Sequence, residues 1–347
     1  MPEGHGLKTR LPQFRVWPLF LLLFSFLPRA DAKVLIRLGT MAPEGSTWHD
    51  ALLQIRQDWR KISNGEVELR IYAGGVLGDE AEMIRKVQRR GLDAVAVSGS
   101  GLSRIDAGVS ALTVPMMFES YEELDYVRGQ LAPELEKRIE TATFTVLNWS
   151  DAGWVHFFSK QPAQTIGDIQ KMKLWTSAGD PDTVRLFNDL GFTVVPLPAN
   201  EMVTALQTGL IEAIEVPPLF SLLDGTYKQA SNMIDLKWVP LLAATVISTR
   251  SWQQVPEQYR PQLLKAARDA GEGLRSKIRS AGDDAVNEMK TRGLNVVTID
   301  VATLAKWRSE VHNAYPKLRG TLAPADLFDQ ALRLRDQYRA RQAGSQN

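Results

Sequence analysis

The fold of this chain is decided by two stretches of sequence, Val87-Gln88-Arg89-Arg90-Gly91-Leu92-Asp93-Ala94-Val95 and Ala205-Leu206-Gln207-Thr208-Gly209-Leu210-Ile211-Glu212-Ala213-Ile214. In each stretch a helical segment stops at a glycine, and a short apolar run typical of a buried strand follows. Two lobes built to one design would repeat a unit in this way. A glycine between a helix and a strand is also common in unrelated folds, so this alternative stays open.

Around the first stretch, short apolar segments alternate with longer amphipathic ones. The pattern predicts strands over 34–38 and 67–72 and helices over 46–62 and 79–90, the last of which ends at Gly91 as a left-handed residue. Strands that alternate with helices of this length form βαβ units, so we expect an α/β protein with a largely parallel sheet.

Around the second stretch the same alternation continues. It predicts a helix over 182–190 and a strand over 192–195, followed by a long helix over about 256–292 that lies across both lobes. A strand over 294–299 and two C-terminal helices, one of them over about 325–341, complete the chain. No linker rich in proline, glycine or serine separates the halves, so we expect crossing strands to form a hinge between them.

Two lobes are expected because 347 residues exceed what one hydrophobic core usually serves. A cleft between two such lobes closes over a ligand. The predicted division is a signal peptide over 1–32, lobe I over 33–150 with part of about 241–280 returning to it, lobe II over 151–240 with about 281–320, and a C-terminal helix over 321–347.

The first residues have the features of an export signal. Lys8, Arg10 and Arg15 precede the apolar run 16–27, and Ala30-Asp31-Ala32 offers the small residues that a signal peptidase reads. Twelve apolar residues rise only about 18 Å as a helix, which is too short for a hydrocarbon core of roughly 30 Å. We expect cleavage after Ala32 and a soluble protein in the periplasm.

Composition and charge exclude several classes of protein. The leader holds four basic and two acidic residues, so the totals of 41 and 40 become 37 and 38 without it. This balance gives no field for nucleic acid, which needs clustered positive charge. The absence of cysteine removes thiol nucleophiles, thiolate metal sites and the lipidated residue of a membrane-anchored receptor.

The sequence contains no arrangement of residues typical of catalysis or metal binding. His49, His156 and His312 are far apart and form no i, i+4 pair, so neither a metal site nor a cofactor is expected. The run Ser98-Gly99-Ser100-Gly101 lacks the order of a nucleophile elbow and is interpreted as a loop. We therefore expect no enzymatic activity.

Tryptophan is abundant in this sequence and is the remaining candidate for ligand contacts. Nine are present, eight of them outside the leader, and Trp149, Trp154 and Trp175 gather where the lobes are expected to meet. Most buried tryptophans belong to an ordinary core, but a cleft that needs a large apolar contact would use the same side chains.

Several motifs carry a likeness to a known family and follow one another in order along nearly the whole chain. They are Leu38–Pro43, Gly74–Glu80, Leu92–Val95, Ile169–Leu174, Leu190–Phe192 and Thr204–Gly209. The chain resembles the extracytoplasmic solute receptors of TRAP transporters, of the dicarboxylate-receptor type. The resemblance implies two α/β lobes of the periplasmic binding protein fold, a ligand cleft between them, and delivery of a small molecule to a membrane permease.

The chain departs from this family at three contacts for the ligand's carboxylate. Trp175 and Val155 stand where the resemblance places arginines, and Val216 stands where it places an asparagine. A buried carboxylate without a counter-charge costs several kcal/mol, and neither tryptophan nor valine supplies a bidentate grip. We therefore expect an uncharged or largely hydrophobic ligand.

The resemblance brings further positions to the cleft. Met41 and Ala199 add apolar surface, and Trp154 is included for its large ring, whereas Glu80 and Ser98 are suited to orient a hydroxyl, an amine or water. Glu80 has a second interpretation, because an acid at the start of a helix is favoured by the helix dipole.

Other functions stay open from the sequence. They are a periplasmic sensor or adaptor that acts through an additional protein partner, an enzyme on the same fold, and a receptor for a carboxylate held by non-standard contacts. The expected partners of the leading hypothesis are the ligand and the TRAP permease subunits.

Overall fold

The computed structural model describes Gly6 and residues 33–345. Apart from Gly6, the predicted signal peptide over 1–32 lies outside the described residues. Among the residues that are described, no helix combines the length and the apolar character that a membrane span requires.

The strands of the described chain join in one mixed sheet, whose main path runs β2-β1-β3-β9-β4-β7-β5-β6, with β8 and β10 attached beside β4. Their bounds are β1 Val34–Thr40, β2 Val67–Tyr72, β3 Ala94–Ser98, β4 Phe144–Ser159, β5 Lys173–Ser177, β6 Thr193–Leu197, β7 Ala213–Val216, β8 Asn232–Ile234, β9 Val239–Ser248 and β10 Asn295–Val297.

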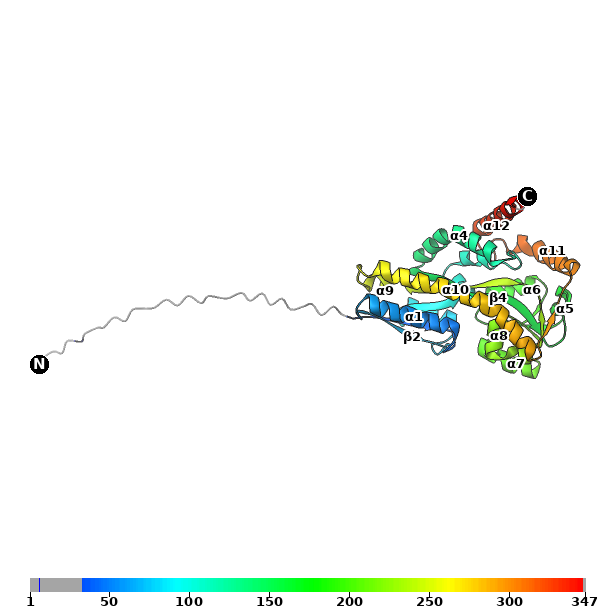
Figure 1. Cartoon of the computed structure of the whole chain (residues 1–347), viewed down its shortest axis with the longest axis horizontal. Helices are drawn as coiled ribbons and strands as arrows, with labels where there is room; N and C mark the ends of the chain where they lie inside the picture. Colours follow the sequence, from blue (N-terminus) through cyan, green and yellow to red (C-terminus); the bar gives the residue numbers. More distant parts are fainter. Residues whose placement is uncertain (1–5, 7–32, 346–347) are drawn as a thin grey trace. The chain divides into compact units, whose positions relative to one another are not determined.

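Helices cover this sheet and extend beyond it (Figure 1). The α-helices are α1 Thr47–Ile62, α2 Glu80–Gln88, α3 Gly99–Ser103, α4 Tyr121–Thr141, α5 Ile166–Gln170, α6 Pro181–Asp189, α7 Met202–Thr208, α8 Pro218–Asp224, α9 Thr249–Gln254, α10 Arg260–Thr291, α11 Val301–Leu318 and α12 Ala325–Ser345. Short 3₁₀ turns span Ala107–Leu112, Ala199–Glu201 and Thr226–Lys228.

The two halves of the sheet repeat one design. In the first half β2, β1 and β3 are parallel and β9 joins them antiparallel; in the second half β6, β5 and β7 are parallel and β4 joins them antiparallel. The repeated sequence unit forms the helix and inner strand of each half, α2 with β3 and α7 with β7. The prediction of a two-lobed α/β fold is therefore confirmed.

One local prediction is wrong. Gly91 does not take a left-handed conformation; Arg90 does, with φ of 65°, because α2 ends at Gln88, two residues earlier than expected. Gly91 then donates its N–H to the carbonyl of Lys86 at 2.7 Å. In the second unit Gly209 does adopt the left-handed form, with φ of 74°.

Helix α10 lies across both halves, as the sequence predicts. It packs against α1 and β4 and, further along, against α8 (Figure 1). The predicted border between the lobes near residue 150 falls inside β4, which pairs with β9 in one half and with β7 in the other. The division of the chain into lobes by residue number stays a prediction.

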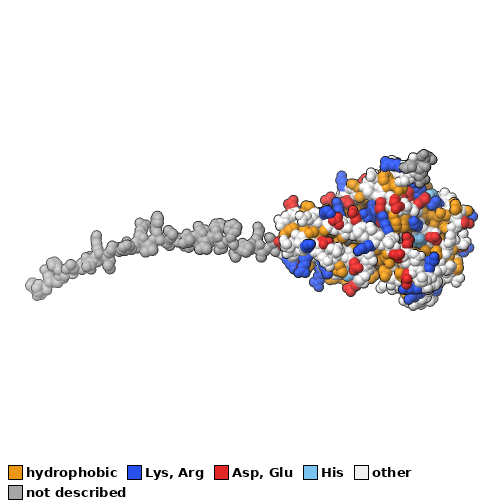
Figure 2. Space-filling model, viewed as in Figure 1, with side chains coloured by type: hydrophobic (Ala, Val, Ile, Leu, Met, Phe, Trp, Pro, Cys, Tyr) orange, Lys and Arg blue, Asp and Glu red, His pale blue; other side chains and the backbone are white. Residues whose placement is uncertain are grey.

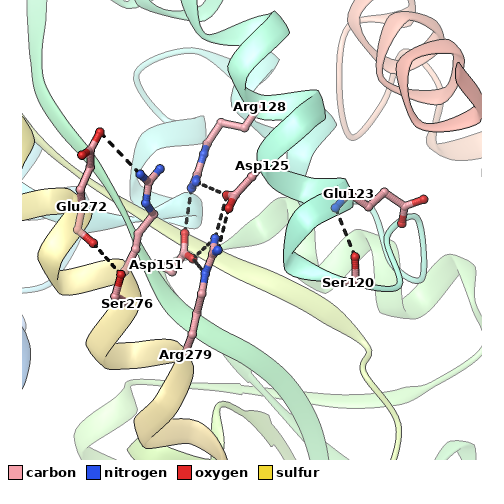
Figure 3. Close-up of polar contacts among 9 residues, drawn as sticks. Ser120, Glu123, Asp125, Arg128, Asp151, Glu272, Ser276 and Arg279 are labelled. Atoms are coloured by element: carbon pink, nitrogen blue, oxygen red, sulfur yellow. Dashed lines mark hydrogen bonds and ion pairs between the residues drawn. The ribbon is translucent and has the colours of Figure 1, made fainter. Parts of the chain in front are cut away.

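A cluster of buried charges fixes α4 and α10 to β4 at this crossing (Figure 3). Asp151 of β4 is 1% exposed and accepts hydrogen bonds from Arg128 Nη1 and Arg279 Nε, both at 2.8 Å. Arg279 also holds Asp125 of α4 through two hydrogen bonds of 2.6 and 2.7 Å, and its guanidinium lies 4.1 Å from the ring centroid of Tyr121. Three elements that are distant in sequence thus share one ion network.

The contact between α10 and β4 requires a glycine at position 271. A Cβ there would stand 2.7 Å from the carbonyl oxygen of Trp149 and 2.8 Å from Asn148 Cβ, whereas one at Gly273 would meet nothing within 4 Å. We predict that Gly271→Ala lowers the free energy of unfolding by about 1–3 kcal/mol through overpacking. Gly273→Ala should raise it by up to about 1 kcal/mol through helix propensity. Denaturant titration of both variants measures this, and equal effects would contradict the close contact.

The ion network gives a second prediction. Asp151→Asn leaves two guanidinium groups without their shared buried carboxylate, and we expect a loss of about 3–5 kcal/mol in the free energy of unfolding. The matched control is Asp269→Asn, which breaks the exposed pair with Lys265 on the surface of α10 and should change stability little. Thermal unfolding measures both variants, and a small effect of Asp151→Asn would show that the network is dispensable.

Candidate functional site

Three of the predicted ligand contacts come together in the second half of the sheet. Trp175 of β5, Val216 of β7 and Ala199 belong to one apolar cluster, in which the first two are buried. Trp175 is 7% exposed, and its Nε1 donates to the carbonyl oxygen of Leu197 at 3.1 Å. The cluster therefore presents apolar surface where the resemblance places polar contacts for a carboxylate.

Two other predicted residues lie in a different cluster. Val155 and Trp154 of β4 are buried among residues that also pack against α4, α6 and α11. The Trp154 ring lies 5.5 Å from the ring of Tyr121 and 5.5 Å from Lys237 Nζ, and its Nε1 has no hydrogen-bond partner. The structure thus does not bring Trp154 and Val155 into the Trp175 cluster.

Glu80 and Ser98 form a pair in the first half of the sheet. Both carboxylate oxygens of Glu80 are used, since they accept the backbone N–H and the hydroxyl of Ser98 at 2.7 Å each. Burial is the main cause that raises the pKa of Glu80, and the hydrogen bonds from Ser98 oppose it. Met41, the last of the predicted set, is 38% exposed and lies against Gly75.

The Glu80–Ser98 pair of the first half lies close to the β5–α6 turn of the second half. Arg104, which caps α3 of the first half, donates a hydrogen bond to the carbonyl oxygen of Gly179 in the second. The next residue, Asp180, caps α6 and lies near enough to Glu80 for its charge to raise the pKa of that carboxyl further. Glu80 and the β5–α6 turn therefore belong to one site.

Sequence analysis missed an acidic residue beside this site. Protein surrounds the Glu215 carboxyl of β7, although the side chain keeps some contact with solvent, and among the described residues none forms a hydrogen bond or ion pair with it. Desolvation, and then the charge of Asp180, raise the pKa of Glu215 to about 8. The available signal was a lone acid between apolar residues in a predicted strand, Ala213-Ile214-Glu215-Val216.

The described residues contain no group of three or more histidine, cysteine or acidic side chains placed to hold a metal ion. His156 of β4 is buried, and its Nδ1 lies 3.2 Å from the carbonyl oxygen of Ile234. Burial lowers the pKa of this histidine, so it belongs to the core rather than to the site.

The sequence pattern of one family, described as bacterial extracellular solute-binding protein, family 7, matches residues 38–320. The chain belongs to this family. Its members are receptors of TRAP transporters, which bind small molecules and work with membrane permease components, so the chain is a solute-binding receptor rather than an enzyme.

Individual relatives match the chain over most of its length. The chain is 22% identical over 274 residues to a solute-binding protein of Roseobacter denitrificans, a match of 77% of this chain and 82% of that protein. It is also 22% identical over 284 residues to the 2,3-diketo-L-gulonate-binding periplasmic protein YiaO of Escherichia coli, covering 80% and 84%.

Solved structures share the fold. A TRAP periplasmic solute-binding protein of Xanthobacter autotrophicus, solved with bound β-D-galacturonate, superposes with a TM-score of 0.80 at 20% identity. The match covers 87% of this chain and 99% of that one. The receptor therefore has the two-lobed architecture of its family.

The raised pKa of Glu215 predicts how stability depends on pH. A glutamate in an unfolded chain has a pKa of about 4.3, so between that value and about 8 the folded receptor binds more protons than the unfolded chain. Stability contributed at Glu215 is then lost as pH rises through this window. We predict that Glu215→Gln raises the Tm of the ligand-free receptor at pH 8 by at least about 2–4 °C and leaves it unchanged near pH 4.

The control for this measurement is Glu201→Gln, because Glu201 is exposed in the same half of the sheet. This variant should follow the wild-type profile of Tm against pH. A wild-type profile that is flat between pH 5 and 8 would show that Glu215 is not held in its neutral form.

Proposed function

We propose that this receptor binds an uncharged or largely hydrophobic small molecule rather than a simple carboxylate. The observation that carries the proposal is the environment of Trp175. Its ring closes an apolar cluster with Val216 and Ala199, and its N–H already donates to Leu197. A carboxylate at this position would be desolvated without a partner, at a cost of several kcal/mol.

The contrast with relatives supports the same interpretation. The protein from Xanthobacter autotrophicus was solved with β-D-galacturonate, and YiaO is named for binding 2,3-diketo-L-gulonate. Both names describe sugar acids, which need a counter-charge when they are enclosed. In this chain the three positions that the family resemblance assigns to carboxylate contacts are Trp175, Val155 and Val216.

We place the receptor in the periplasm, exported by a signal peptide over 1–32 and, without cysteine, carrying no lipid anchor. The TRAP permease would receive its ligand, and an additional periplasmic protein partner remains a further proposal. Acidic and basic side chains are interspersed on the face seen in Figure 2, which gives that face no stripe of positive charge for nucleic acid.

A second candidate ligand is a carboxylate held by non-standard contacts, and Arg104 favours it. This arginine stands at the boundary between the halves, where its guanidinium donates to the carbonyl of Gly179. A ligand acid that displaced this carbonyl would gain a charge-assisted hydrogen bond. The two candidates differ in the response of the receptor to organic acids.

We predict that C4-dicarboxylates and sialic acid do not raise the Tm of the purified receptor in a thermal-shift titration, because the site offers them no arginine pair. Native mass spectrometry of protein from its own host should instead show a co-purified molecule without a carboxylate. Clear stabilisation by an acid that Arg104→Met abolishes would replace the first candidate with the second.

A further inference from the structure

Three carboxyl groups lie around the boundary between the halves of the sheet, and no ion pair of the described residues involves any of them. Glu80 belongs to the first half, and Asp180 and Glu215 belong to the second. Burial chiefly, and the charge of Asp180 in addition, raise the pKa values of Glu80 and Glu215. The boundary therefore carries three acids that no arginine or lysine of the described residues pairs with, since the guanidinium of Arg104 donates to the carbonyl of Gly179 instead.

The three acids differ in how far their hydrogen-bonding capacity is used. Glu80 accepts two hydrogen bonds from Ser98, and Asp180 accepts from the N–H and the hydroxyl of Thr183 at 3.0 and 2.8 Å. Glu215 accepts none, and desolvation and the charge of Asp180 are the two causes of its raised pKa. Glu215 is thus the member of the group that has its acceptors left for a ligand.

A buried hydroxyl without a partner lies beside Glu215. Thr176 of β5 is 0% exposed, and its Oγ1 forms no hydrogen bond with any residue that the structure describes. Leu174 pairs with Ala213 between the parallel strands β5 and β7, so Thr176 and Glu215, each two residues further along, belong to the same face of these adjacent strands. An unused hydroxyl and an unused carboxyl therefore lie on one face, near the ends of the two strands.

On the other side of β7, the residue of β4 that pairs with Glu215 is not a cation. Glu215 pairs directly with Phe157 of β4, and Val155, on the same face as Phe157, stands diagonally across from it. A long basic side chain at 155 would be within reach of the carboxyl, whereas valine is not a partner for it. Within the part of the chain that the structure describes, no arginine or lysine is therefore paired with the Glu215 carboxyl.

Thr176 and Glu215 stand near the carboxyl ends of their strands. Thr176 is followed by Ser177, the last residue of β5, and Glu215 by Val216, the last residue of β7. Ligands of open α/β sheets bind outside the carboxyl ends of the parallel strands. Trp175 and Val216 point to the other face at the same strand ends, so one molecule above these ends has access to both the acid and the apolar cluster.

We propose that the ligand carries an amino group on its apolar body, and that Glu215 together with Thr176 binds this group. An ammonium group donates one hydrogen bond to the Glu215 carboxylate and one to the Thr176 hydroxyl, and its charge replaces the cation that the chain lacks. The inference rests on the proposed function, since it assigns the polar end of a ligand whose remainder contacts apolar side chains.

Isothermal titration calorimetry with three probes of the same body tests this directly. The probes are 2-phenylethylamine, 2-phenylethanol and 3-phenylpropionate, which present an ammonium, a hydroxyl and a carboxylate on one phenylalkyl group. We expect the amine to bind at least about tenfold more tightly than the alcohol, as charge-assisted hydrogen bonds do relative to neutral ones, and the acid to bind least.

Two conservative variants assign the effect to residues. Glu215→Gln should weaken the amine about tenfold or more and leave the alcohol unchanged, and Thr176→Val should weaken the amine about threefold. Glu201→Gln, an exposed acid in the same half, is the control and should bind all three probes as the wild type does. Both test variants replace an unpaired buried group with a neutral one of similar size, so they should fold.

The pH dependence of binding adds a second readout. Near pH 6 the Glu215 carboxyl is protonated and must release its proton to pair with the ammonium, so affinity for the amine should rise roughly tenfold per pH unit up to about pH 8. Asp180 is the charged group that acts on Glu215. The neighbours of Glu215 on the adjacent strands, Phe157 and Thr176, do not titrate in this range. Glu215→Gln should abolish this rise.

The outcomes separate the inference from the proposed function. If the alcohol binds as tightly as the amine, or none of the probes binds, the amine inference is overturned while an apolar co-purified ligand would still support the proposed function. If the acid binds most tightly, both are overturned. A tighter amine whose advantage survives in Glu215→Gln also overturns the assignment of the site.

Discussion

The structure depends on one shared strand and the buried carboxylate that fixes its surroundings. β4 belongs to both halves of the sheet. Its register with β9 shifts between Asp151 and Gly153, so Asp151 lies at this irregularity. A carboxylate that is 1% exposed is stable only with cationic partners, and Arg128 from α4 and Arg279 from α10 provide them. The same interaction that satisfies Asp151 therefore ties the two covering helices to the crossing.

This constraint determines which side chains can meet. With β4 continuous and α10 packed against β4 through Gly271, the carboxyl ends of β3, β5 and β7 are held toward a common boundary. The bond from Arg104 to Gly179 and the influence of Asp180 on Glu80 are consequences of that arrangement. We propose that a few residues at these strand ends decide the ligand chemistry, while the fold is shared with a solved structure of 20% identity.

Much of the architecture could be predicted from the sequence, because it rests on local patterns. Glycine after a helix and apolar alternation located α2, β3, α7 and β7, and the repeat indicated two lobes. What the sequence could not supply is pairing between distant strands. Thr176 and Glu215 are 39 positions apart in the numbering, and only the pairing of Leu174 with Ala213 places them on one face of adjacent strands. Even local patterns fail where glycine and arginine compete for a left-handed position, as at Arg90.

The pairing of β4 with β7 adds to the interpretation of Trp175 and Val155, which stand where the family resemblance places arginines. From the sequence, Trp175 and Val155 indicate only that a carboxylate has lost its counter-charge. In the structure Val155 lies diagonally across from Glu215, so valine at this position also offers the Glu215 carboxyl no basic neighbour. We infer that these features act together: the apolar cluster around Trp175 is suited to the body of a ligand, and the carboxyl of Glu215 is suited to a positively charged end.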